Sequence, residues 1–175
     1  MRFQIRAPRA SDAKALSDLA QRAKAHWGYP SEWLRLWNGE LTISGDYLLA
    51  HRSFVAESGG KRVGLCVLEI RGTQAELGHV WVAPECHRQG IGTALVARAL
   101  EAAAKAGVKR VEILSDPFAE GFYVRLGARK LRDHAAPMPG ALDRTMPVME
   151  FRFATTWDED EEGEPDVETG SPRGS

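Results

Sequence analysis

Hydrophobic and polar residues alternate along the first residues of the chain and then change to a helical spacing. Phe3 and Ile5 share one face of a period-two run, which predicts a strand over residues 2–6. Ser11 follows where a helix N-cap is expected, and apolar residues then recur every three or four positions: Ala13, Leu16, Leu19, Ala20 and Ala23. The pattern therefore predicts a strand followed by an amphipathic helix.

The next segments predict a short helix and three strands. Gly28 and Pro30 end the first helix, and Ser31 caps a second one that runs to Trp37. Two strand-like runs follow, joined by a turn with two adjacent glycines, and a third run comes after them; their ranges are 53–57, 62–70 and 76–83.

The clearest helical pattern follows the third of these strands. It covers residues 94–106, begins after a Gly-Ile-Gly-Thr segment and ends at Gly107, where a C′ glycine is favoured. Residues 108–114 are apolar and rich in β-formers. Because a helix separates the two strands, we expect them to pair in parallel through a right-handed crossover.

The rest of the pattern completes one domain over residues 1–156. A short helix is predicted over residues 119–126, with further strands near 128–132 and 148–153. The expected fold class is α/β: a mixed, mostly antiparallel sheet with a central parallel β-α-β crossover and helices on both faces.

Charge divides the chain into two parts. The 175 residues are 43% hydrophobic and 27% charged, with a net charge of −1. That total combines +6 over residues 1–156 with −7 over residues 157–175. Dense like charge with almost no apolar residue cannot offset chain entropy, so residues 157–175 are predicted to be a disordered acidic tail, either a solubilising extension or a regulatory segment.

Several protein classes are disfavoured. No run approaches the roughly 18 apolar residues of a membrane span, and the N-terminus has no apolar core of a secretory signal. Cys66 and Cys86 form neither a disulfide framework nor a zinc motif, so we expect a cytoplasmic protein without a metal. The basic body has no dense basic run, so no nucleic-acid partner is expected.

The segment between the third strand and the long helix favours an anion. The first N–H groups of a helix have no partner within it, and the helix dipole adds about half a positive charge there. Gly90 and Gly92 leave these N–H groups uncovered, and Arg88 adds a mobile charge. The sequence lacks the lysine of a P-loop and the third glycine of a dinucleotide fingerprint, so a different pyrophosphate ligand is indicated.

The residues of this loop resemble a known family. His87-Arg88-Gln89-Gly90-Ile91-Gly92 is similar to the Q/R-x-x-G-x-G/A loop of the GNAT superfamily of acyl-CoA-dependent N-acyltransferases. Downstream, residues 115–128 contain Asp116, Ala119, Phe122 and Tyr123, and they resemble that family's D/N-x-x-A-x-x-F-Y motif. The resemblance covers roughly residues 2–153, and it implies acetyl-CoA as co-substrate.

The resemblance also implies roles for individual residues. The main chain of Trp81 and Val82 would pair with the pantetheine arm, and Tyr123 would protonate the departing thiolate. The implied pyrophosphate site, made mainly of main-chain N–H groups, consists of His87, Arg88, Gln89, Gly90, Gly92 and Thr93. Two departures are His87, where the family has Gln or Arg, and Phe118, where relatives often have Asn and where we still expect a cofactor contact.

The base and the acceptor site depend less on the motif. Glu76, at the start of the third predicted strand, is the candidate base for a protonated amine, since the resemblance implies a catalytic Glu at this position in several family members; a solvated strand end is its alternative. His79 is three residues further on, so it is predicted on the opposite strand face. Aromatic residues after the first helix are either an amine site or the core of a helical hairpin, the candidates being Trp27, Tyr29 and Trp33.

Two functions remain open at this point. The first is an enzyme that transfers acetyl from acetyl-CoA to a primary amine of a small molecule or peptide by direct attack in a ternary complex. The second is an inactive or weakly active acyl-CoA-binding or interaction module. The pattern leaves the oligomeric state open, with a homodimer as one alternative.

Overall fold

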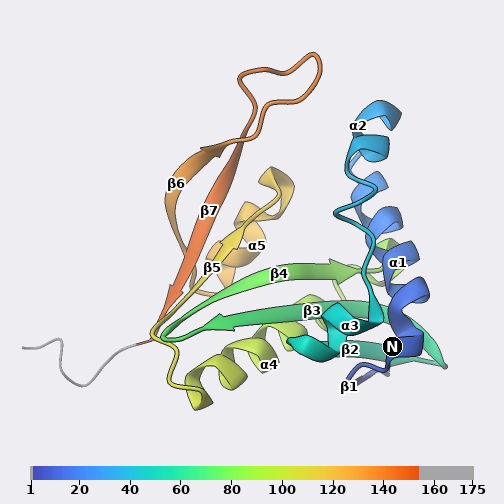
Figure 1. Cartoon of the computed structure of the whole chain (residues 1–175), viewed down its shortest axis with the longest axis vertical. Coiled ribbons are helices and arrows are strands. Elements are labelled where there is room, and N and C mark those ends of the chain that lie inside the picture. The colour runs from blue at the N-terminus through green and yellow to red at the C-terminus, as the bar shows by residue number, and fades with distance from the viewer. Residues whose placement is uncertain (1, 154–175) are drawn as a thin grey trace, which may run out of the picture.

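The structure is a computed structural model that describes residues 2–153. A single sheet of seven strands runs through the molecule (Figure 1), in the order β1-β2-β3-β4-β5-β7-β6. The predicted tail, residues 157–175, lies outside the described residues. The strands are β1 (Gln4–Arg6), β2 (Arg52–Ser58), β3 (Lys61–Arg71), β4 (Gln74–Val82), β5 (Arg110–Leu114), β6 (Arg129–Ala135) and β7 (Thr145–Arg152).

Helices cover both faces of the sheet, as predicted. On one face α1 packs on β3 and β4, and Ser17 of α1 donates a hydrogen bond to the carbonyl of Ile43 just before α3. On the other face α4 packs on β2 and β3, where a side chain on Gly64 would collide with Leu95. The helices are α1 (Ala13–Ala25), α2 (Ser31–Leu36), α3 (Gly45–Ala50), α4 (Ile91–Lys105) and α5 (Glu120–Arg125).

The central crossover is confirmed. Strand β4 leads through α4 into β5, and the two strands pair in parallel. This pairing extends only from Gln74–Glu76 on β4 to Arg110–Glu112 on β5, after which the strands diverge (Figure 1). Helix α4 presents Leu95, Val96, Ala99 and Ala103 to the core, and all four are fully buried.

The short helix α3 was not predicted. It has six residues, of which only Leu48 is buried, so its apolar periodicity is too short to recognise. Its start is nevertheless well defined, because the Ser44 side chain accepts a hydrogen bond from the Tyr47 amide at 3.1 Å. The helix places Tyr47 over the sheet.

A bulge in β4 overturns one prediction. Val67 pairs with His79 and Leu68 pairs with Leu77, so Gly78 is an extra residue with no partner on β3. The bulge reverses the alternation of side chains along the strand. The prediction that Glu76 and His79 lie on opposite faces is therefore wrong: both lie on the α3 face.

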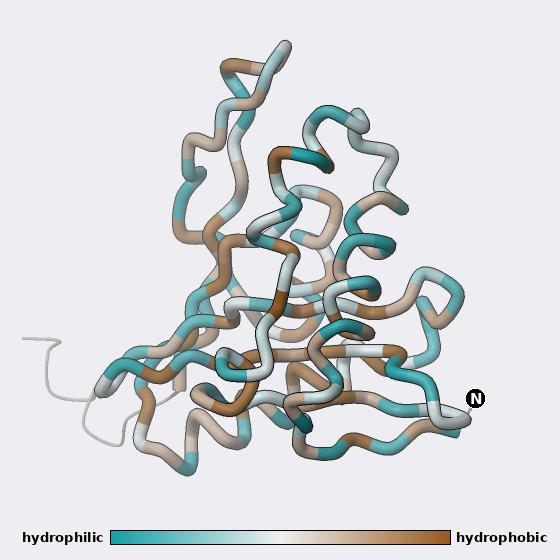
Figure 2. The backbone as a smooth tube through the Cα atoms, turned by 45° about the vertical axis from the view of Figure 1, so that its right-hand side comes forward, coloured by the Kyte–Doolittle hydropathy of each residue, from teal (hydrophilic) through white to brown (hydrophobic). Residues whose placement is uncertain are grey.

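The core is continuous along the central strands. Figure 2 shows hydrophobic segments running through the middle of the sheet and hydrophilic ones at many of the outer turns. The buried residues of β3, from Val63 to Leu68, pack between the two helical layers. This packing stabilises β3 and β4, which hold the site described next.

Candidate active site

A cavity of about 1010 Å³ opens where β4 and β5 diverge. Its walls come from the second half of β4, the start of α4, the end of β5, α5 and the end of α1. Of the residues predicted for the site, those lining it are Trp27, Trp81, Val82, His87, Arg88, Gly90, Gly92, Thr93, Phe118 and Tyr123. Glu76, Gln89, Tyr29 and Trp33 are not among its lining residues.

One end of the cavity is the N-terminus of α4. Gly90 takes a φ of +79° and starts a helix of 15 residues. Within residues 2–153, the main-chain N–H groups of residues 88–93 have no hydrogen-bond acceptor, whereas the amide of His87 donates to the Pro84 carbonyl at 3.2 Å. Six N–H groups and the helix dipole therefore favour an anion here.

Small and basic residues complete this anion site. A Cβ on Gly92 would lie 3.2 Å from the Phe122 ring, so the helix start approaches α5 closely. Arg88 and Arg125 both line the cavity, and neither forms an ion pair with any described residue. Arg125 was not predicted; its place in the last turn of a short helix gave no signal beyond its charge.

The β4 side of the cavity is an open strand edge. Because β5 leaves β4 after Glu76, no strand neighbours β4 on that side from Leu77 to Val82 in the described part of the chain. Unpaired strand edges take up extended chains through main-chain hydrogen bonds. One carbonyl is already engaged: Nε2 of His87 lies 3.3 Å from the Val82 oxygen. A carbonyl only accepts, so His87 carries its proton on Nε2.

Tyr123 is a buried phenol in the same cavity. Only 3% of the residue is exposed, and its ring meets that of Phe122 edge-on at 5.0 Å. Burial, with the nearby Cys66 thiol and Asp116 carboxyl, raises the pKa of Tyr123 well above its ordinary value. Its hydroxyl therefore keeps its proton near neutral pH and is available as a donor of that proton.

Carboxylates form a row across the α3 face where β4 and β5 separate. We call it the glutamate row: directly paired positions on four adjacent strands hold Glu69, Glu76, Glu112 and Glu150. The row beside it, two residues away on each strand, consists of Arg71, Gln74, Arg110 and Arg152.

Glu76 differs from the other members of the glutamate row. Arg71 lies 3.1 Å from Glu69, Arg110 lies 4.0 Å from Glu112 and Arg152 lies 2.7 Å from Glu150. Beside Glu76 stands Gln74, and Glu76 has no ion pair or hydrogen bond within the described chain. It is therefore a half-buried carboxylate without a counter-ion at the last paired position before the cavity.

Side chains from α3 and β3 cross over the bulge. Tyr47 donates a hydrogen bond from Oη to Oε1 of Glu69 at 2.6 Å. A Cβ on Gly78 would lie 2.5 Å from that Oε1 and 2.6 Å from that Oη, so the pair occupies the space above this glycine. Gly78 lines the cavity. The sequence did not predict Tyr47 and Glu69 near the cavity, because only the pairing of β3 with β4 and the bulge at Gly78 bring them there.

The aromatic candidates divide into two groups. Trp27 stacks on Phe118 at 5.2 Å and 11° at the cavity wall. Tyr29 and Trp33 pack with Trp37 around cations of the protein itself, since the Arg144 guanidinium lies within 6 Å of all three rings. Trp33 also donates from its indole to the Pro139 carbonyl at 2.9 Å. This second group ties α2 to the loop between β6 and β7.

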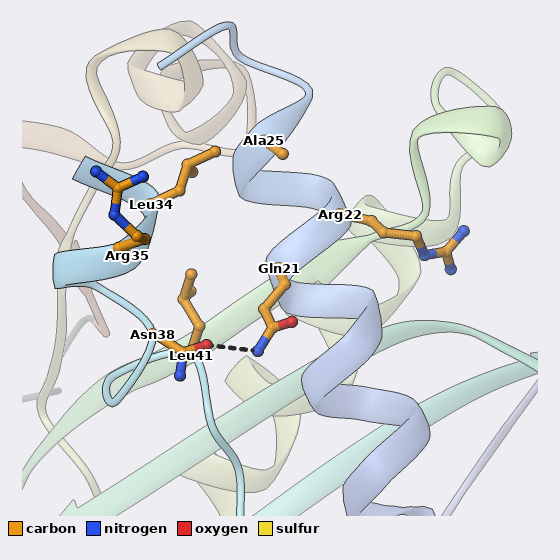
Figure 3. Close-up of a pocket in the computed structure, with 7 residues that line it drawn as sticks. All are labelled: Gln21, Arg22, Ala25, Leu34, Arg35, Asn38 and Leu41. Atoms are coloured by element: carbon orange, nitrogen blue, oxygen red, sulfur yellow. Dashed lines mark hydrogen bonds between the residues drawn. The ribbon is translucent and has the colours of Figure 1, made fainter. Parts of the chain in front are cut away.

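A smaller pocket of about 470 Å³ lies between α1 and α2 (Figure 3). Gln21 and Asn38 are joined across it by a hydrogen bond of 2.9 Å, and Leu34 and Leu41 form its apolar wall. It shares no lining residue with the cavity at β4 and β5. The two pockets are therefore separate.

Two kinds of feature are absent from the described residues. No helix of residues 2–153 is long and apolar enough to cross a membrane. The same residues contain no group of three or more His, Cys, Asp or Glu side chains placed to hold a metal ion.

Solved structures of known proteins share this fold. The PaiA N-acetyltransferase of Thermoplasma acidophilum, solved with coenzyme A, is 20% identical with a TM-score of 0.69 over 87% of this chain and 100% of its own. The ribosomal-protein-S18-alanine N-acetyltransferase of Escherichia coli is 20% identical with a TM-score of 0.68 over 90% of this chain and 98% of its own. A GCN5-related N-acetyltransferase of Rhodopseudomonas palustris is 15% identical with a TM-score of 0.72, over 87% of this chain and 97% of its own.

The comparison with family models agrees with these structures. No curated protein matches the chain. The model of the acetyltransferase (GNAT) family matches residues 14–128, which include β4, the loop at the start of α4 and Tyr123. Because this match spans more than half of the sequence, the chain belongs to the acetyltransferase (GNAT) family.

Proposed function

We propose that this protein transfers the acetyl group of acetyl-CoA to a primary amine by direct attack in a ternary complex. The observation that carries the proposal is the combination, in one cavity, of a helix N-terminus, whose N–H groups have no acceptor within residues 2–153, with a buried, protonated tyrosine. The N–H groups suit a pyrophosphate, and the open edge of β4 suits the extended pantetheine arm.

The donor half follows from these groups. Main-chain N–H groups of residues 88–93, with Arg88 and Arg125, would bind the pyrophosphate, while Phe118 and Trp27 would cover the arm. The main chain of Trp81 and Val82 would pair with the arm as an added strand. These contacts would direct the thioester toward the point where β4 and β5 separate.

The chemical step needs one base and one acid. An ammonium has no lone pair, so Glu76 would accept a proton from the amine before attack. The amine nitrogen then bonds to the thioester carbon, the carbon–sulfur bond breaks, and the sulfur takes the proton of Tyr123. The nitrogen loses its second proton as it becomes an amide, and this proton, passed on by solvent, would restore the neutral hydroxyl of Tyr123, while Glu76 returns its own proton to solvent. A strand N–H near Val82 would hold the carbonyl oxygen while it carries negative charge. The products are an N-acetyl amide and coenzyme A.

Release of free thiol from acetyl-CoA tests this proposal. With a panel of primary amines, wild-type protein should release thiol and add an acetyl mass to one or more amines. Tyr123→Phe should lower kcat by about 100- to 10 000-fold, as loss of a general acid does. Because burial raises the pKa of Tyr123, the wild-type rate should show no loss from ionisation of this acid between pH 7 and 9.

Coenzyme A binding provides the control. Tyr123→Phe should bind coenzyme A as the wild type does, because the pyrophosphate contacts lie on α4. Binding of coenzyme A without turnover of any amine would instead support the acyl-CoA-binding module. If the wild-type protein did not bind coenzyme A at millimolar concentration, both functions would be overturned.

A further inference from the structure

We infer that Lys24 is a positioning residue of the donor site: through its ion pair with Asp116 it holds the aromatic wall against which the pantetheine arm of coenzyme A packs. This wall consists of Trp27 and Phe118, which stack on each other at the cavity. The inference rests on the proposed function for the identity of the ligand, but binding alone tests it.

Lys24 lies at a position of α1 where the spacing predicts an apolar side chain. It follows Leu16 and Ala20 at intervals of four residues, so it continues the buried face of the helix. Only 8% of its side chain is exposed, although lysine is almost never buried without a partner. That partner is Asp116, whose carboxylate is 10% exposed and lies 2.7 Å from the Lys24 ammonium. The pair joins two segments that are 92 residues apart in the chain.

Stability alone does not account for this ion pair. Taking two charges out of water is costly, and apolar side chains of similar volume often stabilise a core as well as a buried ion pair does. The pair does fix the distance between the end of α1 and the end of β5. The ammonium is itself held by two rings, since Nζ lies 4.9 Å from the centre of the Tyr29 ring and 4.3 Å from that of the Trp37 ring. Lys24 therefore fixes the place of the Asp116 carboxylate.

Asp116 in turn fixes the main chain that follows β5. Its Oδ1 accepts a hydrogen bond from the Phe118 amide at 3.1 Å and so caps the 3-10 turn Pro117–Ala119. The Tyr29 hydroxyl donates to the same oxygen at 3.0 Å. Burial and the Asp116 charge raise the pKa of Tyr29 to about 12, so this donor keeps its proton near neutral pH. The turn that carries Phe118 therefore depends on a carboxylate that Lys24 and Tyr29 hold.

The Phe118 ring is the exposed part of the wall. Phe118 lines the cavity and is 58% exposed, and its ring stacks on Trp27 and meets Tyr29 edge-on at 5.7 Å. Trp27 and Tyr29 belong to the turn that follows Lys24, so the ion pair joins the two segments that supply the wall. An exposed aromatic face in a cavity suits the arm of the ligand, whereas the N–H groups of residues 88–93 suit its pyrophosphate. Loss of the ion pair should therefore affect the arm and not the pyrophosphate.

Calorimetry with two ligands separates these contributions. The ligands are coenzyme A and 3′-phosphoadenosine 5′-diphosphate, which is coenzyme A without its arm. In Lys24→Met the Kd for coenzyme A should rise roughly 3- to 30-fold, because binding must then order the loosened wall. The Kd for the nucleotide should stay within about twofold, since its contacts lie on α4. Tyr29→Phe leaves the ion pair in place and removes one hydrogen bond to Asp116, so it should weaken coenzyme A binding by about 2- to 5-fold and leave the nucleotide unchanged.

The matched control is Arg6→Met. It breaks an ion pair to another buried carboxylate, Asp12, and neither residue lines the cavity. It should lower the melting temperature and leave both Kd values unchanged. A purely structural role of Lys24 predicts instead that Lys24→Met lowers the affinity for both ligands alike, as a destabilised fold would.

Three results would overturn the inference. They are equal affinity of the wild-type protein for the two ligands, equal losses of affinity for both in Lys24→Met, and no loss for either. Should Lys24→Met fail to fold, Tyr29→Phe decides, and an unchanged ratio of its two Kd values overturns the inference. The expected ratios without acetyl transfer to any amine would instead overturn the proposed reaction and leave the role of Lys24 standing.

Discussion

The two sides of the diverging strands present different groups. On the α4 side these groups are main-chain amides, exposed by Gly90 and by the start of a helix. On the α3 side, next to the bulge of β4, they are charged and polar side chains, Tyr47, Glu69 and Glu76, which come from three separate elements. With the function that we propose, binding of the donor would depend mainly on backbone conformation and binding of the acceptor on these side chains.

This difference makes the two halves separable by mutation. A substitution that changes the backbone at the start of α4 should weaken coenzyme A binding and leave the amine untouched. A substitution that changes charge or space on the α3 face should act on the amine and on the chemical step.

Glu76→Gln should have the largest effect. Without a base, kcat should fall by about 100- to 10 000-fold at pH 7, while the Kd for acetyl-CoA stays the same. The defect should shrink as the pH approaches the pKa of the amine, because a growing share of the amine is then neutral without help. Rates measured from pH 6.5 to 9.5 for both proteins check this. A defect of constant size across that range would contradict a role as base.

Gly78→Ala should have the second-largest effect, a rise in the KM for the amine. The new Cβ would lie 2.5 Å from Glu69 and 2.6 Å from Tyr47, so their hydrogen bond must shift. Overpacking of this kind costs about 1–3 kcal/mol, which corresponds to a roughly 5- to 150-fold rise in the KM for the amine. The KM for acetyl-CoA should stay within about twofold.

Gly39→Ala is the matched control for this bulge. Gly39 has open space around its Cβ position and does not line the cavity. It should leave both KM values unchanged. If Gly78→Ala raised both KM values equally, the bulge would be a general support of β4 rather than a means of placing the acceptor groups.

The contrast between the two sides also explains how much the sequence could predict. The main-chain part of the donor half lies within one contiguous stretch, residues 81–93, whose strand, glycines and helix are local features. Its strand–helix–strand frame, the parallel pairing and the order of nearly all elements were therefore predictable and are confirmed.

The acceptor half was not predictable in the same way. Tyr47 belongs to a six-residue helix without a clear pattern, and Glu69 reaches it only through the pairing of β3 with β4. The bulge placed Glu76 and His79 on the same face of the sheet instead of on opposite faces. The only local signal for the bulge was a glycine, Gly78, within a strand pattern. Glu76 was singled out by its position in the strand, but its missing counter-ion became visible only in the cross-strand register.

Gly90→Ala tests the donor side and should weaken coenzyme A binding. Gly90 has a φ of +79°, a conformation that costs an alanine about 1–2 kcal/mol, so coenzyme A should bind roughly 5- to 30-fold more weakly as the helix start distorts. Gly107→Ala is its control, because Gly107 ends the same helix with a φ of +74° and also has open space. It should lower the melting temperature to a similar degree and leave coenzyme A binding intact. Equal losses of affinity in both variants would mean that helix stability, rather than the exposed amides, sets the affinity.

His87→Ala should have the smallest effect, and in the opposite direction. The Nε2 proton of His87 occupies the Val82 carbonyl on the open edge of β4, so an arm that pairs with this edge must displace it. A hydrogen bond of this kind contributes about 0.5–1.5 kcal/mol, and removing it should tighten coenzyme A binding by about 2- to 10-fold. His26→Ala is the comparison, since its ring contacts His87 edge-on at 5.2 Å without bonding to β4. Calorimetry measures the Kd for coenzyme A of both variants. Weaker binding by His87→Ala would contradict the prediction, because it would mean that the imidazole contacts the ligand. A side chain would then contribute to the half of the site that we assign to the main chain.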